Sequence, residues 1–222
     1  MRIIDKINTE IENDNIFYSF EFFPPKTSTG MQNLYFKLNR MAKLEPLYID
    51  VTWGAGGSTS KLTMDVCNNS QNIICVETQM HITCTNINQE IVCKSLNIAK
   101  DNNIRNILAL RGDPPIDKKN CEEDTEFKYA IDLVKYIRKE YGDYFGISVA
   151  GYPEGHPNGD YKKDLEYLKQ KIDAGADFII SQLFYDVDVF LKFVKDCREI
   201  GIQCPIIPGI APICNYNNFN RM

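Results

Sequence analysis

Seven short apolar runs recur along the chain, and each ends in glycine, proline or polar residues. Most apolar positions within a run are consecutive, which is typical of strands buried on both faces of a parallel sheet. The pattern therefore predicts seven parallel strands. The runs occupy residues 17–23, 47–53, 78–84, 104–110, 146–152, 178–184 and 205–210.

A helical periodicity separates several of these runs, with apolar residues at intervals of three and four. A short helix is also expected before the first run. Gly142, Gly175 and Gly201 follow three of the helical segments, where a glycine commonly ends a helix. The helical positions are Met31, Leu34, Leu38 and Met41; Phe127, Ala130, Val134 and Ile137; Tyr161, Leu165, Leu168 and Ile172; and Phe190, Phe193, Val194 and Cys197.

The alternation of strand and helix predicts one α/β domain over residues 1–222. Strand starts are about 31 residues apart, and a complete (β/α)8 TIM barrel runs to about 250 residues. A doubly wound open sheet would need a Gly-rich motif after the first strand, where this chain has Phe22–Pro25. We expect an incomplete (β/α)8 barrel of about seven β–α units, truncated before the last strand and helices and lacking a regulatory domain.

The fourth run, Ile107–Leu110, ends in Arg111, Gly112 and Asp113, followed by two prolines that cannot continue strand pairing. Barrel enzymes place their chemistry at the carboxyl ends of the strands. A solvated strand end before a turn is the simpler interpretation of this one stretch. Because similar strand ends recur along the chain, we interpret it as part of a site.

Glu21 lies in a strand otherwise filled by aromatic residues. Phe20 and Phe22 share one face of that strand, and Ser19 and Glu21 share the other. If the phenylalanines pack under the helices, Glu21 points into the barrel near its upper rim. Burial should raise the pKa of such a carboxyl, which suits a general acid. The alternative is a structural ion pair with a barrel lysine or arginine.

Further polar residues follow other strands. Thr52 and Trp53 precede a Gly- and hydroxyl-rich loop at residues 54–60, which suits an oxyanion or a polar ring edge but also a simple helix cap. The other strand-end residues are His81, Tyr152, His156 and Gln182. Ser148 lies in mid-strand and lacks the glycine of a nucleophile elbow. Without a nucleophilic triad or a metal site, the chemistry would need a cofactor.

The composition suits a globular protein and narrows the choice of partners. The net charge of −5 argues against nucleic acid and anionic membrane surfaces. We find no signal peptide and no apolar stretch that could span a bilayer, so a cytoplasmic location is expected. The eight cysteines form no Cys-x-x-Cys pair, and His81 and Cys84 would point to opposite faces of a strand. No metal site is predicted.

Taken together, the motifs resemble those of methylenetetrahydrofolate reductases. Their residues are more similar to the eukaryotic branch of that family. The matching stretches run in family order along nearly the whole chain. They are SFEFFPPK (19–26), DVTWGAGGS (50–58), HITC (81–84), ALRGDPP (109–115), YPE (152–154), DAGA (173–176), QLFYD (182–186) and PGI (208–210).

The resemblance implies an FAD-dependent reduction of 5,10-methylenetetrahydrofolate to 5-methyltetrahydrofolate. NADH or NADPH would be the donor, the two substrates would take turns over the flavin, and the product would feed methionine synthesis. Glu21 would be the acid that opens the methylene bridge, Asp113 would stabilise positive charge, and Gln182 would bind both substrates. The implied FAD contacts are Thr52, Trp53, Ala55, His81, Arg111, Gly112, Asp113, Ala130, Tyr152, His156, Asp164 and Lys171.

Two alternatives to an active reductase domain stay open at this point. One is an inactive fragment of the reductase that binds flavin or a partner chain. A different pterin-binding barrel enzyme is the other alternative, whereas an aldolase would need a strand lysine that the chain lacks. The sequence decides neither the nicotinamide donor nor whether the protein forms a homo-oligomer.

Overall fold

Strands and helices alternate along the chain in the computed structural model, which describes residues 1–54, 60–84, 87–112, 127–156, 159–213, 216 and 220. The strands are β1 Ser19–Phe22, β2 Tyr48–Val51, β3 Thr78–Thr83, β4 Asn106–Leu110, β5 Gly146–Gly151, β6 Phe178–Ser181 and β7 Ile206–Ile207. The helices are α1 Ile3–Glu12, α2 Ser28–Ala42, α3 Ser60–Asn72, α4 Gln89–Asp101, α5 Ala130–Tyr141, α6 Tyr161–Asp173 and α7 Val187–Glu199.

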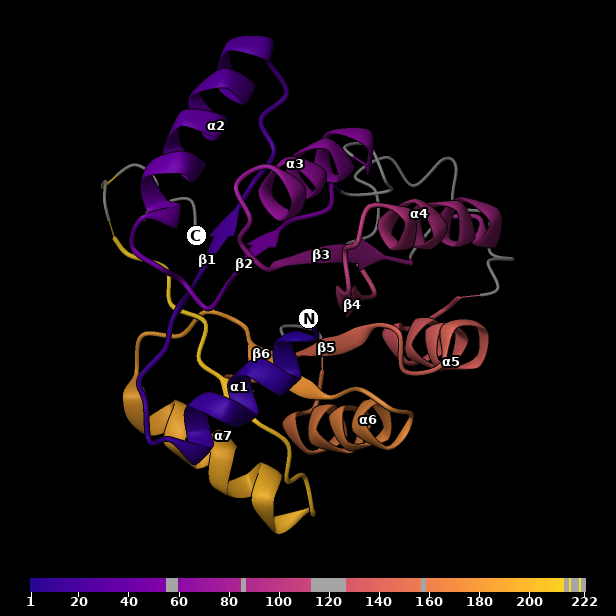
Figure 1. Ribbon diagram of the computed structural model, residues 1–222. Coiled ribbons are helices and arrows are strands. Elements are labelled where there is room, and N and C mark those ends of the chain that lie inside the picture. The colour runs from indigo at the N-terminus through magenta and orange to yellow at the C-terminus, as the bar shows by residue number, and fades with distance from the viewer. Residues whose placement is uncertain are drawn as a thin grey trace.

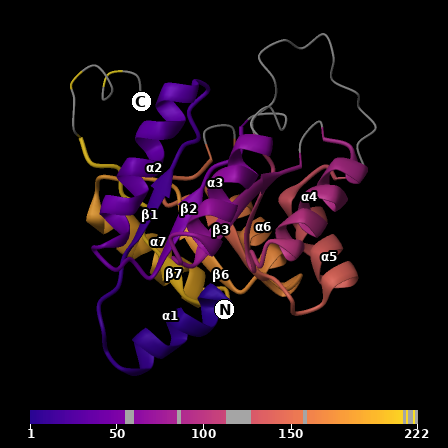
Figure 2. The same ribbon diagram turned by 45° about the horizontal axis from the view of Figure 1, so that its top comes forward.

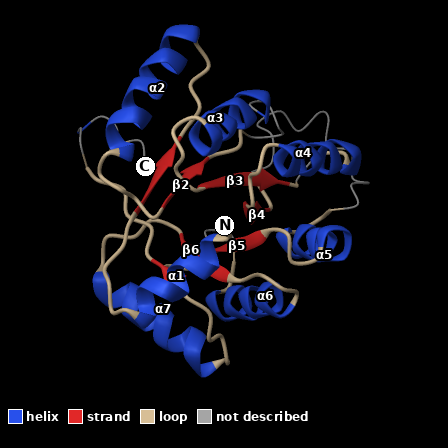
Figure 3. Cartoon of the chain, in the orientation of Figure 1, coloured by secondary structure: helices blue, strands red, loops and turns tan. Residues whose placement is uncertain are grey.

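The strands form one parallel sheet in the order of the sequence, from β1 to β7. The sheet curls around an axis, and helices α2 to α7 surround it (Figure 1, Figure 3). A doubly wound sheet would reverse its strand order, which this sheet does not do. The incomplete barrel predicted from the sequence is therefore confirmed, with β1 and β7 as the edge strands of the described sheet.

Several strands are shorter than the apolar runs predicted. The run at 17–23 pairs only over Ser19–Phe22, and the run at 205–210 only over Ile206–Ile207. Pro24 and Pro208 come shortly after these paired residues, and a proline has no N–H to continue the ladder. Apolar runs also include residues that pack beyond the last paired position, so run length overestimates strand length here.

The helices agree with the predicted periodicity, with one exception. Phe127 was predicted as a helical position, but α5 begins at Ala130, and the Asp132 carboxylate accepts the backbone N–H of Tyr129 just before it. Phe127 is buried before the helix and packs its ring 5.2 Å from that of Tyr136. The three predicted glycine terminators all have a positive φ, as a helix-ending glycine requires: Gly142, Gly175 and Gly201.

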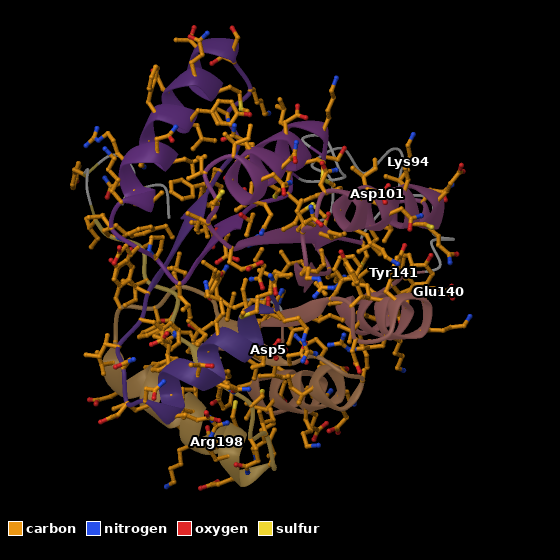
Figure 4. All side chains as sticks on the ribbon, viewed as in Figure 1. Asp5, Lys94, Asp101, Glu140, Tyr141 and Arg198 are labelled. Carbon is orange, nitrogen blue, oxygen red and sulfur yellow. The ribbon has the colours of Figure 1, made fainter. Side chains whose placement is uncertain are left out.

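The main core lies between the sheet and the surrounding helices. Ile107 and Ala109 are fully buried there, together with alternate residues of the neighbouring strands. Polar contacts join the helices outside the core. Tyr141 of α5 points toward α4 (Figure 4), and its hydroxyl lies 2.9 Å from Asn97 Oδ1. None of the helices in the described ranges is long and apolar enough to cross a membrane.

Helix α1 covers the amino end of the barrel (Figure 2). Ile3 and Ile7 are fully buried there against Tyr48 and Phe178. The buried side chain of Asn106 fixes the start of this helix: its Oδ1 accepts a bond of 2.6 Å from Ile3 N, and its Nδ2 donates to the Met1 carbonyl. One end of the barrel is thus closed, and the carboxyl ends of the strands form the other.

We expect Asn106→Ala to lower the free energy of unfolding by about 1–3 kcal/mol, because it leaves the buried Ile3 N–H without an acceptor. Urea unfolding measures the loss. Asn39→Ala is the matched control, since Asn39 is exposed on α2 and, among the described residues, bonds within its own helix to the Tyr35 carbonyl. The control should change stability by no more than about 0.5 kcal/mol, and equal losses would refute the anchoring role of Asn106.

Candidate functional site at the carboxyl end of the barrel

Most of the predicted site residues lie at one end of the barrel. Because all strands are parallel, their carboxyl ends meet at the end opposite α1. The strands and the turns after them bring together Glu21, Thr52, His81, Arg111, Gly112, Tyr152 and Gln182. Ala55 and Asp113, two further predicted contacts, lie outside the described residues.

Glu21 is aligned with Asp50 in the pairing of β1 with β2, so both side chains belong to the interior face. The prediction that Glu21 is buried is wrong, since the residue is exposed at the open end of the barrel. Neighbouring protein atoms still shield its carboxyl in part from water, and this desolvation raises the pKa of the carboxyl. The nearby His81 lowers this pKa and Asp50 raises it. No ion pair of the described residues includes Glu21, which counts against the structural ion-pair alternative.

Beneath Glu21 lies a chain of buried polar side chains that the sequence analysis missed. Asp50 Oδ1 accepts a bond of 2.6 Å from Gln79 Nε2 and lies 3.3 Å from His81 Nε2. Ser148 Oγ donates to Gln79 Oε1 over 3.0 Å. All four residues are buried, none more than 4% exposed. The available signal was Asp50 itself, a carboxylate inside the apolar run at 47–53.

The ends of β3 and β4 form a tight cradle. Gly112 has a φ of +86°, and a Cβ on it would lie 2.8 Å from Thr83 Cβ. Thr83 Oγ1 is buried and finds no hydrogen-bond partner among the described residues. Arg111 places its guanidinium 5.2 Å from the centre of the Tyr129 ring. A partnerless hydroxyl beside a glycine that admits no side chain suits the polar edge of a flat ligand approaching the backbone.

Two predicted cofactor contacts lie against the core. Trp53 is 7% exposed and packs among the core residues, so its side chain faces away from the barrel interior. Ala130 is the first residue of α5 and is also buried. Thr52 lies at the end of β2, where its carbonyl accepts a bond from Thr63 of α3. Any cofactor contact of Trp53 would therefore use its backbone.

The segment after β5 is held by α6. Tyr152 and His156 pack edge to face, with ring centres 5.1 Å apart, and Asp164 accepts the His156 backbone N–H over 2.7 Å. On the same helix, Lys171 Nζ donates to the Ala150 carbonyl over 2.8 Å. Burial lowers the pKa of Lys171 to about 8, and Asp164 partly opposes this shift. Asp164 and Lys171, two helical turns apart, thus border the site at β5.

Gln182 follows β6 and is exposed, while its backbone N–H is anchored to the Gly151 carbonyl over 2.7 Å. The Gln182 side chain therefore lies outside the core, while a hydrogen bond holds its backbone in place. Within the described ranges, no three His, Cys, Asp or Glu residues are grouped as metal ligands. The six described cysteines are free thiols. Acid–base groups and polar contacts thus make up the described part of this site.

Comparison with known proteins identifies the family. The family model described as methylenetetrahydrofolate reductase matches residues 6–222. The chain belongs to the methylenetetrahydrofolate reductase family. "Methylenetetrahydrofolate reductase (NADH) 1" of Arabidopsis thaliana is 52% identical over all of this chain and 39% of its own length. "Methylenetetrahydrofolate reductase 2" of Saccharomyces cerevisiae is 52% identical over 92% of this chain and 35% of its own length.

The chain therefore spans about two fifths of the plant reductase that it matches. The "5,10-methylenetetrahydrofolate reductase" of Pectobacterium carotovorum is 38% identical over 91% of this chain and 66% of its own length. Two solved structures that are 13% and 14% identical to this chain have a similar barrel, and this similarity concerns the fold alone. A phosphonopyruvate hydrolase covers 94% of this chain and 72% of its own, with a TM-score of 0.63. A Clostridium thermocellum protein that binds 5-methyl-5,6,7,8-tetrahydrofolic acid covers 91% and 68%, with a TM-score of 0.62.

We expect Gly112→Ala to destabilise this reductase-family chain more than Gly201→Ala. The two glycines have similar φ values of +86° and +83°, but a Cβ at Gly201 would have only an ordinary contact of 3.7 Å. Both variants carry the backbone strain of about 1–2 kcal/mol, and Gly112→Ala adds a clash of about 1–3 kcal/mol. Urea unfolding compares them, and equal losses would rule out the tight contact with Thr83.

The free energy of unfolding should rise by about 1–2 kcal/mol between pH 8 and pH 10, after allowance for partial exposure of Lys171. Its pKa is about 8 in the folded chain and 10.5 for the free side chain. Between these values the unfolded chain binds the extra proton, so stability rises with pH. Urea unfolding at several pH values should show this rise in the native chain and its absence in Lys171→Met. The same rise in both would contradict the burial of this amine.

Proposed function

We propose that this chain is a catalytic domain that reduces 5,10-methylenetetrahydrofolate to 5-methyltetrahydrofolate with electrons from NADH or NADPH. Family membership supports the reaction class. The observation that carries the proposal is the position of Glu21, an acid with a raised pKa on the interior face at the open end of the barrel. The small-molecule substrates would enter from this end, since α1 covers the other.

The carboxyl end of the barrel would hold FAD, which would supply hydride transfer between the nicotinamide and the folate. The buried Thr83 hydroxyl and the cradle at Gly112 fit the polar edge of such a ring. His81 and Tyr152 would contact it from β3 and the end of β5. The remaining contacts implied by the family motifs are Thr52, Trp53, Ala55, Arg111, Asp113, Ala130, His156, Asp164 and Lys171.

Glu21 would act on the folate. Its carboxyl would give a proton to the nitrogen that leaves the methylene carbon, so the carbon–nitrogen bond of the bridge breaks and a 5-iminium cation forms. A carboxyl with a raised pKa holds that proton at a higher pH than an ordinary glutamate does. Asp113 would stabilise the positive charge, and the exposed Gln182 would hydrogen-bond each substrate in turn.

The choice of donor differs among the relatives by name. The Arabidopsis thaliana protein is named as an NADH enzyme and a Caenorhabditis elegans relative as an NADPH enzyme. We propose that the product feeds methionine synthesis in the cytoplasm. The net charge of −5 favours small-molecule substrates over nucleic acid.

Glu21→Gln should slow oxidation of the reduced flavin by methylenetetrahydrofolate about 10²–10⁴-fold, the usual contribution of a general acid. Reduction of the flavin by NADH or NADPH needs no proton from Glu21 and should keep its rate. Stopped-flow absorbance of the flavin-loaded protein separates the two half-reactions. The exposed Glu166→Gln on α6 is the control and should change neither. Equal slowing of both half-reactions by Glu21→Gln would contradict the acid role.

A further inference from the structure

Asp50 is a buried carboxylate for which the proposed reaction provides no role. It is 4% exposed, lies in the middle of β2 and has no lysine or arginine partner among the described residues. Burying an ionised carboxylate is costly, and an apolar side chain of similar size commonly stabilises a core at least as well. Its presence in the barrel interior therefore calls for a reason other than stability.

The hydrogen bonds around Asp50 run in one direction. Ser148 Oγ donates to Gln79 Oε1, which turns the Gln79 amide NH₂ toward Asp50 Oδ1. His81 Nε2 approaches the same oxygen at 3.3 Å. An ionised carboxylate only accepts hydrogen bonds, so His81 must carry a proton on Nε2 to bond with it. Asp50 thereby fixes the ring orientation of His81 and leaves Nδ1 as the other polar atom of the ring.

Asp50 is also the residue aligned with Glu21 between adjacent parallel strands, and both side chains share the interior face. We propose that Asp50 is a positioning residue of the same site, which fixes His81 through Nε2 and, as a negative charge beside Glu21, keeps Glu21 in its proton-donating form. This inference rests on the proposed function, because it gives Asp50 its role through the acid Glu21.

The charges around Glu21 support this role. Among the described residues, Asp50 on β2 raises the pKa of Glu21, while His81 on β3 lowers it. Tyr48, two residues before Asp50, is buried, and burial raises the pKa of its hydroxyl, so it stays neutral. The His81 ring, when it is protonated, and the buried Asp50 carboxylate therefore shift the pKa of Glu21 in opposite directions. Removing only the charge of Asp50 should make Glu21 ionise at lower pH.

The test compares Asp50→Asn with Ser148→Ala in the flavin-loaded protein. Asparagine keeps the size of Asp50 and removes its charge. Ser148→Ala removes a hydrogen bond from the same buried chain and leaves that charge in place. Stopped-flow rates of flavin oxidation by methylenetetrahydrofolate, measured from pH 5 to 9, give the pH at which the rate falls. We expect this pH to move down by about one unit in Asp50→Asn and to stay unchanged in Ser148→Ala.

Unchanged pH profiles in both variants, or the same shift in both, would overturn the role of Asp50. The Glu21→Gln variant keeps this result separate from the proposed function. If Glu21→Gln retains the native rate and profile, the proposed function fails. If Glu21→Gln behaves as expected and Asp50→Asn shows no shift, only the inference about Asp50 fails.

A second measurement needs neither turnover nor a folded variant of Asp50. The chain has two histidines, His81 and His156, so their ring ¹⁵N signals are resolved by NMR and assigned with His156→Gln. We expect neutral His81 in the native chain to carry its proton on Nε2. A proton on Nδ1 instead would show that Asp50 does not hold the ring and would overturn the proposal.

Discussion

The buried carboxylate of Asp50 is the constraint around which the barrel interior is arranged. A negative charge that water cannot reach needs hydrogen-bond donors from the protein, and Gln79 and His81 supply them from the adjacent strand. Ser148, from β5 across the interior, fixes Gln79 in turn. These hydrogen bonds thus connect strands that are not neighbours in the sheet. They also hold the Asp50 carboxylate at a fixed position below the site.

The two ends of the barrel differ because different groups close them. At the amino end, apolar residues of α1 pack on Tyr48 and Phe178, and Asn106 bonds the start of that helix. At the carboxyl end, strands give way to polar side chains and to a glycine cradle. The pairing of the parallel strands fixes the relative heights of these residues, with Glu21 and Gly112 at the open end and His81 buried within β3. This division of stability and function is the usual one in parallel barrels.

Much of the fold followed from the sequence because local patterns determine it. Consecutive apolar residues such as Ile107–Leu110 marked the buried strands, and Gly142, Gly175 and Gly201 marked helix ends. The strand lengths could not be predicted from the sequence. Apolar residues that pack beyond the last paired position have the same pattern as strand residues. The exposure of Glu21 also did not follow, because it depends on how far the open end of the barrel admits water.

The candidate site was predictable only in part. Gln182 stood out as a side chain at a strand end, because parallel strands bring those ends together. His81 was also predicted at a strand end, but it lies inside β3 and is buried. The chain of Ser148, Gln79, Asp50 and His81 did not stand out, since its members come from three strands and their contacts depend on the stagger between them. Asp50 was visible as a charge in an apolar run, but its partners became clear only from the register.

In the proposed function, a flavin at the carboxyl end of this barrel would relay electrons from a nicotinamide to a folate. The most direct measurement is the visible spectrum of the FAD-loaded protein, kept free of oxygen, during successive additions of NADH or NADPH and of methylenetetrahydrofolate. We expect the nicotinamide to bleach the flavin bands and the folate to restore them, with one 5-methyltetrahydrofolate formed per flavin. A protein that retains no flavin, or a bleached flavin that the folate does not restore, would contradict the proposed function.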